Sequence, residues 1–305
     1  MASLHTLDQR LLDQSLTATG SAGGMLPGAS IRPRFNTQIL TRFVDASDPR
    51  TLARAQVLTR DQVRELYKYW DADLQSYTYL QAFLQTHPRW MNDFAEVATR
   101  HGVPSQDMDP DRLGDEICGI LELAPEREER FAEVIDQDDA DGAANYWLGM
   151  LQISPARQPA TYLLIRVGRR IGEHVVMCLK DYFRSPRPSQ LSPAVVPMID
   201  PPGTPSFPAG HAVQSYLISY LLAYSLPNIP QHHLGDVERA TGPLFKLADR
   251  ISQNRVVAGV HFPTDIIAGK AVGIACFEAL QRVGALWDAK DGLRGRVREE
   301  LPQYA

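Results

Sequence analysis

The chain has 305 residues, of which 44% are hydrophobic and 22% are charged, values that are ordinary for a globular protein with a sizeable core. Its formal net charge of -5 gives no reason to expect a nucleic-acid partner. The cysteines are few, scattered and odd in number, so neither a disulfide framework nor a zinc site is expected from them. They are Cys118, Cys178 and Cys276.

The N-terminus lacks a basic region followed by an apolar run, so no secretory signal is expected. The most apolar stretch, residues 212–226, is short for a membrane span and contains Gln214, Ser215 and Ser219. We therefore expect a soluble, cytoplasmic protein with a small-molecule substrate and no membrane partner. Whether the chain forms a homo-oligomer is left open.

Residues 1–35 mix Ser, Thr, Gly and Pro and predict an extended N-terminal arm. Residues 36–150 predict a helical region packed on a C-terminal core. Apolar residues recur there at intervals of three and four, and one such amphipathic helix begins after Asp61. Two further helices are predicted at 90–101 and 111–123.

An acidic stretch, residues 136–142, resembles part of a calcium-binding loop. If Gly142 is the sixth residue of an EF-hand loop, Gln137 and Leu148 take the first and twelfth positions, where Asp and Glu are needed. An acidic loop before the helix that contains Trp147 is therefore the favoured interpretation.

Residues 151–287 are more apolar and predict the helical core, followed by a charged surface tail over 288–305. No strand alternation and no internal repeat is visible. The sequence predicts an all-α fold, a helical bundle with its active site at helix ends in the C-terminal half. Helices are predicted at 162–179, at 212–224 after His211, at 237–257 and at 264–283.

The first of three polar clusters spans residues 180–188, at the end of the long helix. Lys180 and Arg187 lie seven residues apart across this helix end, so both side chains can bend toward one point. Alone the pair is weak evidence for an anion-binding site, because cations at a helix C-terminus usually complement the helix dipole.

The second cluster, residues 205–211, ends in Pro208-Ala209-Gly210-His211. Gly210 permits close approach of the backbone to a ligand, and the following helix presents free N–H groups that suit an anion. A tight turn capped by a histidine is an equal alternative for this cluster by itself.

The third cluster spans residues 255–265. Asp265 follows His261 by four residues and can accept its Nδ1 proton, which leaves Nε2 free to attack or to ligate. Arg255 can reach the same anion, and its apolar neighbours argue against a solvated ion pair. Together the clusters supply the cations, histidines and turn that suit a tetrahedral oxyanion.

In order and spacing these clusters resemble the type 2 phosphatidic acid phosphatase / vanadium-dependent haloperoxidase superfamily. The pattern of that superfamily is Lys-x6-Arg-Pro, then Pro-Ser-Gly-His, then Ser-Arg-x5-His-x3-Asp. The match covers roughly residues 160–285, and a chance match of all three clusters is improbable.

The resemblance implies that His261 is the nucleophile toward phosphate, or the residue that bonds vanadium in a haloperoxidase. It implies that Asp265 orients His261 and that His211 is the acid–base residue. The groups implied to bind the oxygens of phosphate or vanadate belong to Lys180, Arg187, Gly210 and Arg255.

Two positions depart from the pattern. Ala209 replaces a serine that donates to the oxyanion, and the loss of one neutral donor should weaken anion binding by roughly 1 kcal/mol. Asn254 replaces the serine before Arg255 and keeps a polar side chain, so we expect this change to matter less.

Phosphate and vanadate have the same shape, so the site residues alone do not separate two functions. The absence of membrane helices and of a signal peptide, and the extra helical chain before the clusters, favour a vanadate-dependent haloperoxidase. It would oxidise halide with hydrogen peroxide, with vanadate as cofactor. Thr204 and Ala209 argue against it.

The alternative is a soluble acid phosphatase that hydrolyses phosphomonoesters through a phosphohistidine and needs no cofactor. A non-enzymatic helical scaffold with a degenerate pocket is a third reading. The complete set of charged residues in the three clusters disfavours it.

Overall fold

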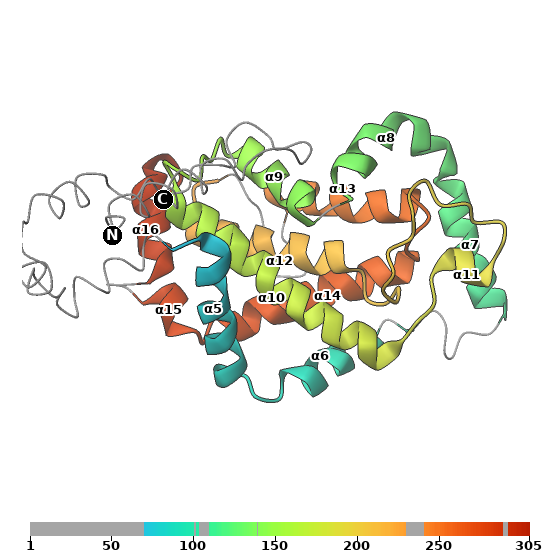
Figure 1. Ribbon diagram of the computed structural model, residues 1–305, viewed down its shortest axis with the longest axis horizontal. Coiled ribbons are helices and arrows are strands. Elements are labelled where there is room, and N and C mark those ends of the chain that lie inside the picture. The colour runs from blue at the N-terminus through green and yellow to red at the C-terminus, as the bar shows by residue number, and fades with distance from the viewer. Residues whose placement is uncertain (1–69, 101, 104–109, 139, 230–240, 289–291) are drawn as a thin grey trace, which may run out of the picture. The chain divides into compact units, whose positions relative to one another are not determined.

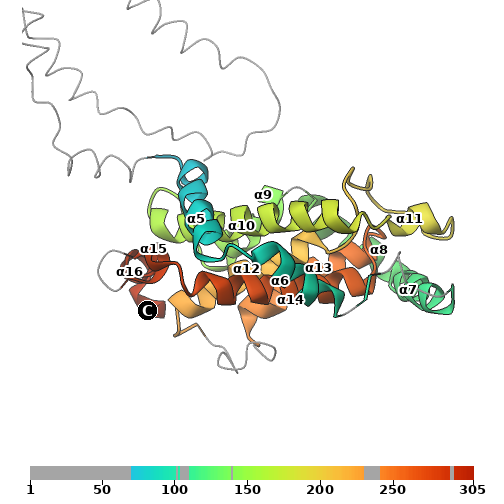
Figure 2. The ribbon, with the colours of Figure 1, turned by 90° about the horizontal axis from the view of Figure 1, so that it is seen from below.

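Helix α12 (Gly210–Ser225) lies at the centre of the molecule, and most of its side chains are buried. In the computed structural model it packs against α10 (Pro159–Phe183), α14 (Pro263–Leu280) and α13 (Pro243–Val257). Figures 1 and 2 show α10, α12 and α14 running alongside one another. A helix that is apolar around most of its circumference is stable only when other helices surround it, which explains this place in the fold.

The structure describes residues 70–305 except 101, 104–109, 139, 230–240 and 289–291. These residues all belong to one compact unit, Arg64–Ala305. The predicted N-terminal arm, residues 1–35, lies outside the described residues, and so does the first part of the helix predicted after Asp61, up to residue 69. The predicted boundary at residue 150 stays a prediction.

The close approach of α12 to two of its neighbours depends on glycines four residues apart. Gly168 and Gly172 lie on α10, and Gly269 and Gly273 lie on α14. A Cβ atom at Gly269 would lie 2.7 Å from an atom of α12, and one at each of the other three would lie 2.9 Å away. Larger side chains would push the helices apart and displace the N-terminus of α12 with them.

Shorter helices surround this core. α5 packs on α10, α6 on α14 and α10, α7 on α14, and α8 on α13, while α9 contacts α10, α12 and α13. Their bounds are α5 Ala72–Thr86, α6 Trp90–Thr99, α7 Pro110–Glu122, α8 Arg127–Asp136 and α9 Ala140–Met150, with a 3-10 turn at Ala124–Glu126 and a short helix α11 at Pro188–Leu191.

The C-terminal residues pack back onto the start of α10. The elements there are α15 (Gly284–Trp287), α16 (Leu293–Glu300) and a 3-10 turn at Pro302–Tyr304. Glu300 caps α10 by accepting from Ala160 N at 2.7 Å and from Thr161 N at 2.8 Å. Leu293 and Val297 are fully buried. This packing differs from the surface tail expected from the charge of the segment, because two apolar residues four apart give α16 a buried face.

The prediction of an all-α fold is confirmed, and the described residues contain no β-strand. The helices predicted in the core and at 90–101 and 111–123 are present within a few residues. Helix α8 was not predicted from the sequence, because its residues are highly charged and only Arg130 and Val134 are buried. None of the described helices combines the length and the apolar character needed to cross a bilayer.

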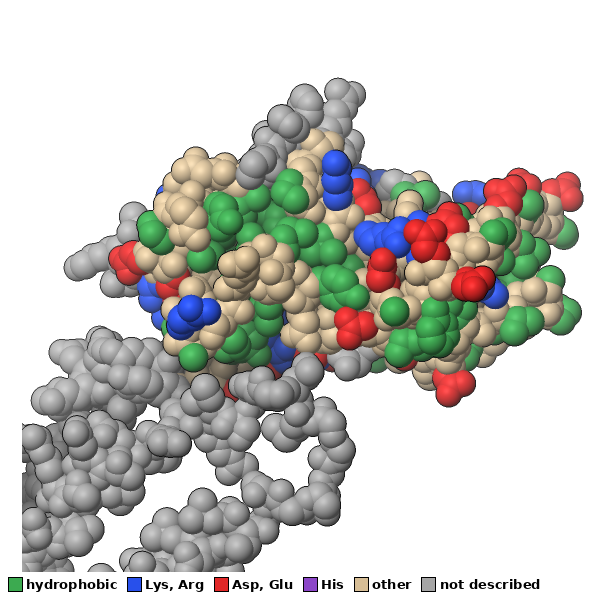
Figure 3. All heavy atoms as spheres, turned by 90° about the horizontal axis from the view of Figure 1, so that it is seen from above, with side chains coloured by type: hydrophobic (Ala, Val, Ile, Leu, Met, Phe, Trp, Pro, Cys, Tyr) green, Lys and Arg blue, Asp and Glu red, His purple; other side chains and the backbone are tan. Residues whose placement is uncertain are grey.

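Basic and acidic side chains lie next to one another on the face of the molecule drawn in Figure 3, so this face does not present a single sign of charge. Ion pairs also join neighbouring helices. Arg250 Nε of α13 lies 2.8 Å from Glu133 Oε2 of α8, and Arg169 Nε of α10 lies 3.1 Å from Asp141 Oδ1 of α9.

Candidate active site

The ends of α10 and α13 and the beginnings of α12 and α14 meet at the right-hand end of the view in Figure 1. All residues predicted for the site lie on these elements or in the turns between them. Lys180 is in the last turn of α10, Arg187 precedes α11, Gly210 and His211 open α12, Arg255 is in the last turn of α13, and His261 and Asp265 stand at the start of α14.

His261 is buried beside the carboxylate of Asp265, with Nδ1 3.0 Å from Oδ2. The same oxygen accepts from Phe262 N at 3.0 Å and from Ser206 Oγ in a short hydrogen bond. Because an ionised carboxylate can only accept, we assign the His261 proton to Nδ1, which leaves a lone pair on Nε2. The predicted orientation of His261 by Asp265 is thus present in the geometry.

The Nε2 atom of His261 lies 3.0 Å from Arg187 Nη1. Arg187 is held in place by main-chain acceptors, since it donates to Val260 O at 2.7 Å and to Thr204 O at 3.0 Å. Its guanidinium is therefore fixed beside the nitrogen that would attack, where an anionic substrate needs a cation.

Lys180 is buried and reaches the start of the second cluster. Its Nζ donates to Pro205 O in a short hydrogen bond and to Ser206 O at 3.3 Å. Burial, and then the charge of Arg187, lowers the pKa of Lys180 to about 7. The charge of this side chain is therefore sensitive to pH near neutrality.

Arg255 is almost fully buried, with Nη2 donating to Val134 O at 2.9 Å and Nη1 3.5 Å from Asp138 Oδ1. Among the described residues, Nε and Nη1 of Arg255 have no hydrogen-bond partner. Burial lowers the pKa of Arg255 to about 10, so the side chain stays charged at neutral pH. Two buried donors are thus available for the oxygens of an anion.

His211 opens α12, and its Nε2 lies 2.8 Å from Gln137 O. A carbonyl oxygen accepts only, so Nε2 carries the proton and Nδ1 is the atom left to exchange protons with a ligand. Burial, and then the charge of Arg255, lowers the pKa of His211 to about 3. The imidazole is neutral at pH 7 until an anion binds nearby and favours its protonated form.

The pKa values of the buried pair His261 and Asp265 are shifted in opposite directions from their ordinary values. Burial lowers the pKa of His261 well below its usual range, and the cations of Arg187 and Lys180 act in the same direction. Burial raises the pKa of Asp265 to about 6, although Ser206 and the Phe262 N–H favour the ionised form. At neutral pH, His261 is an unprotonated nucleophile beside a carboxylate.

Ala209, which replaces the serine of the pattern, is buried at the N-cap of α12 and makes no side-chain cap. Its N–H donates to Asp265 O at 3.0 Å, so the second and third clusters are joined through the main chain. The N–H of Gly210, in the first turn of α12, has no intrahelical acceptor and suits an anion.

Sequence analysis missed several contributors to the site. Ser206 contacts both Asp265 and His261, and its position in the second cluster was the only signal available. Val134 and Gln137 contribute main-chain oxygens from the end of α8. No sequence pattern identifies a carbonyl oxygen, because every residue carries one.

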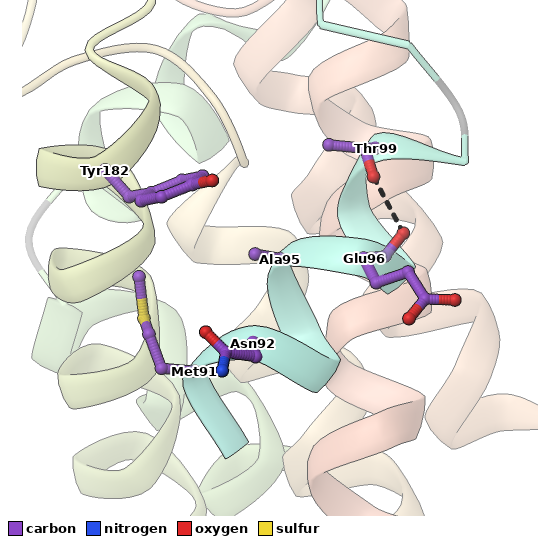
Figure 4. A pocket seen from close by; sticks show the side chains of 6 residues that line it. All are labelled: Met91, Asn92, Ala95, Glu96, Thr99 and Tyr182. Carbon is purple, nitrogen blue, oxygen red and sulfur yellow. Dashed lines mark hydrogen bonds between the residues drawn. The ribbon is translucent and has the colours of Figure 1, made fainter. Parts of the chain in front are cut away.

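A cavity of about 320 Å³ lies elsewhere, between α6 and the end of α10 (Figure 4). The residues that line it are Met91, Asn92, Ala95, Glu96, Thr99 and Tyr182. Tyr182 is two residues from Lys180, which is about 200° around a helix, and it is 65% exposed where Lys180 is buried. None of the predicted site residues lines this cavity.

Comparison with known families gives a match that contains all three clusters. The model of the PAP2 superfamily matches residues 161–285. These residues form a PAP2 superfamily domain. The recognition made from the three clusters is therefore confirmed for these residues.

Similar proteins include phosphatases of two kinds. Decaprenylphosphoryl-5-phosphoribose phosphatase of Mycobacterium tuberculosis is 28% identical over 149 residues, which cover 48% of this chain and 71% of that protein. The non-specific acid phosphatase of Salmonella typhi is 27% identical over 157 residues, 49% of this chain and 56% of its own. Both matches cover about half of this chain.

Two solved structures are similar to part of this chain. A transmembrane PAP2 type phosphatidylglycerolphosphate phosphatase from Bacillus subtilis has a TM-score of 0.42 at 18% identity, covering 63% of this chain and 92% of its own. A bacterial vanadium-dependent iodoperoxidase has a TM-score of 0.46 at 16% identity, covering 60% of this chain and 53% of its own.

Proposed function

We propose that the PAP2 domain hydrolyses phosphomonoesters through a phosphohistidine formed on His261. The observation that carries this proposal is the placement of His261, whose Nδ1 lies 3.0 Å from Asp265 Oδ2 and whose Nε2 lies 3.0 Å from the Arg187 guanidinium. The two relatives found by sequence are phosphatases, and they favour this function over the haloperoxidase that the sequence suggested.

Binding of the phosphoryl group depends on the three buried cations. The guanidinium groups of Arg187 and Arg255 present forked donors, and Lys180 adds a point charge. The N–H of Gly210 adds a neutral donor at the positive end of α12. These groups are fixed before the substrate arrives, so they stabilise developing negative charge without reorganising.

The reaction begins when the lone pair of His261 Nε2 attacks phosphorus and the bond between phosphorus and the leaving oxygen breaks. His211, protonated in the presence of the anion, gives its Nδ1 proton to the leaving oxygen, which departs as an alcohol. Water then attacks the phosphohistidine while His211 takes a proton from it. Phosphate leaves, and the neutral His261 is restored.

The same residues fit vanadate, because it is a tetrahedral oxyanion of the same shape as phosphate. His261 Nε2 would bond the vanadium, and Lys180, Arg187 and Arg255 would hold the oxygens. When bound, vanadate would supply the activation of hydrogen peroxide toward halide. Vanadate as a resident cofactor, a cytoplasmic location and the small-molecule substrate all stay predictions.

The decisive experiment uses the full chain stripped of phosphate. We expect hydrolysis of p-nitrophenyl phosphate, and a phosphorylated His261 trapped by rapid denaturation and identified by mass spectrometry. A parallel sample loaded with orthovanadate is given hydrogen peroxide, bromide or iodide, and a phenolic dye. Halogenation of the dye without hydrolysis in the vanadate-free sample would reverse the order of the two functions.

A further inference from the structure

The last turn of α8 and the residues that follow it, here called the α8 turn (residues 134–138), orient two of the predicted site residues. Arg255 Nη2 donates to Val134 O at 2.9 Å, and His211 Nε2 lies 2.8 Å from Gln137 O. These oxygens lie at the C-terminal end of a helix, where carbonyl groups lack intrahelical donors. They are free to accept from side chains of the site.

Asn254 holds the α8 turn in place from the neighbouring helix α13. Its Nδ2 donates to Gln137 Oε1 at 2.8 Å and to Glu133 Oε2 at 2.9 Å, and its Oδ1 accepts from Arg130 Nη1 at 3.2 Å. The three partners are spaced three and four residues apart, so they share one face of α8. Asn254 is fully buried, and every part of its amide is used.

A serine at this position, as in the superfamily pattern, could not make these bonds. Its hydroxyl has a single proton and cannot donate to Glu133 and Gln137 at once, and it ends one atom closer to the backbone. Asn254 also directly precedes Arg255 in α13. The replacement of this serine by Asn254 therefore matters more than we expected from the polarity of the Asn254 side chain alone.

We propose that Asn254 is a positioning residue for proton transfer, acting through Gln137 to hold the main-chain oxygen that orients His211. The inference rests on the proposed phosphatase function. Without this support the α8 turn loosens, and His211 loses the acceptor that keeps Nδ1 turned toward the leaving group.

The leaving group distinguishes this role from a purely structural one. An alkyl oxygen needs a proton as it leaves, whereas p-nitrophenolate is stable enough to depart without one. A misplaced His211 therefore slows alkyl phosphates more than p-nitrophenyl phosphate. General loss of folded protein lowers both rates by the same factor.

The experiment compares Asn254→Ser and Gln137→Met with wild type, all in the full chain. The second variant keeps the main-chain oxygen and the length of the side chain but removes the acceptor for Asn254. In both variants we expect kcat/KM for butyl phosphate to fall about tenfold more than for p-nitrophenyl phosphate, a fraction of what a general acid contributes. The double variant should lose no more than the larger single effect, because both changes break one link.

Ser252→Ala is the matched control. Ser252 is buried on the same helix, and its hydroxyl donates to Ala248 O at 2.7 Å within α13. It should leave the ratio between the two substrates unchanged. If the Asn254→Ser and Gln137→Met variants lower both rates equally, Asn254 only stabilises the fold and the proposal is overturned.

A second readout needs no activity. In protein labelled with 15N-histidine, the resonance of His211, assigned by its loss in His211→Gln, should report a proton on Nε2. Asn254→Ser should move it toward a mixture of tautomers, and an unmoved signal would refute the positioning role. A moved signal in a protein whose wild type hydrolyses neither ester would uphold that role while rejecting the phosphatase function.

Discussion

The candidate site has two sides that are built by different means. On the motif side, the ends of α10, α12, α13 and α14 contribute charged and titratable side chains, nearly all buried. On the opposite side, the α8 turn contributes main-chain oxygens and one partly exposed carboxylate, Asp138. In the proposed function, the first side supplies the reacting and anion-binding side chains, and the second supplies the oxygens that orient them.

The two sides also differ in how firmly they are held. The motif side surrounds α12, whose close packing leaves no room for even a Cβ at the neighbouring glycines. The α8 turn is held by the hydrogen bond between Asn254 and Gln137 and by one buried apolar residue, Val134, and the contacts of Glu133 with Asn254 and Arg250 lie just before it. Segments with few buried apolar contacts open at lower free energy than a packed core.

The largest effect should come from the motif side. His261→Ala removes the nucleophile, and we expect hydrolysis of p-nitrophenyl phosphate to fall by about 10⁴-fold or more. Vanadate should raise the melting temperature of wild type and stabilise this variant much less, because ligands stabilise the state that binds them. Equal stabilisation of both proteins would place the anion elsewhere.

The charge of Lys180 should make anion binding depend on pH. Its pKa of about 7 is below the ordinary value, so the free protein loses this charge as the pH rises through neutrality. A bound anion favours the protonated form, so Lys180 should add a fall in affinity of up to about tenfold per pH unit above about pH 7, beyond the pH dependence that His211 and Asp265 contribute. Sulfate is the probe, since its own charge does not change in this range.

Calorimetric titration at pH 6, 7, 8 and 9 measures this dependence. Lys180→Arg is the control, because a guanidinium stays protonated throughout, so this variant should lack the part of the pH dependence that Lys180 causes. Asp265 also titrates near pH 6 and is present in both proteins, so only the difference between them reports Lys180. Identical profiles would show that Lys180 does not carry the effect.

A smaller effect, a gain in affinity for vanadate, is expected from Ala209→Ser. The hydroxyl would restore the donor of the superfamily pattern and a favoured N-cap residue for α12, so vanadate should bind more tightly by about tenfold at most. Competitive inhibition by vanadate measures the change. A sharp loss of affinity would mean that the buried methyl group of Ala209 packs where the hydroxyl must go.

The smallest effect should come from the side of the site that the α8 turn forms. Asp138→Asn removes a carboxylate 3.5 Å from Arg255 Nη1 and should tighten sulfate binding by about threefold, a modest change because Asp138 is partly exposed to solvent. Glu128→Gln, also on α8, removes the same charge without touching Arg255 and serves as the control. Equal effects of the two variants would reveal only a change in net charge.

Sequence alone identified the all-α fold and the residues of the motif side. Lys180, Arg187, His211 and the pair of His261 with Asp265 carry distinctive side chains at distinctive spacings, and spacing along a helix end translates directly into proximity. The structure brings these residues together, and their catalytic roles remain predictions for the experiments above.

Tertiary structure decided what completes and orients the site. The contact of Ser206 with Asp265 depends on how two turns meet, and the role of Asn254 depends on which helix lies beside it. The oxygens of Val134 and Gln137 are invisible in any sequence pattern because every residue has a carbonyl group. The sequence determines which reactive side chains are present and how they are spaced. Their orientation is determined by the helix ends that pack against them.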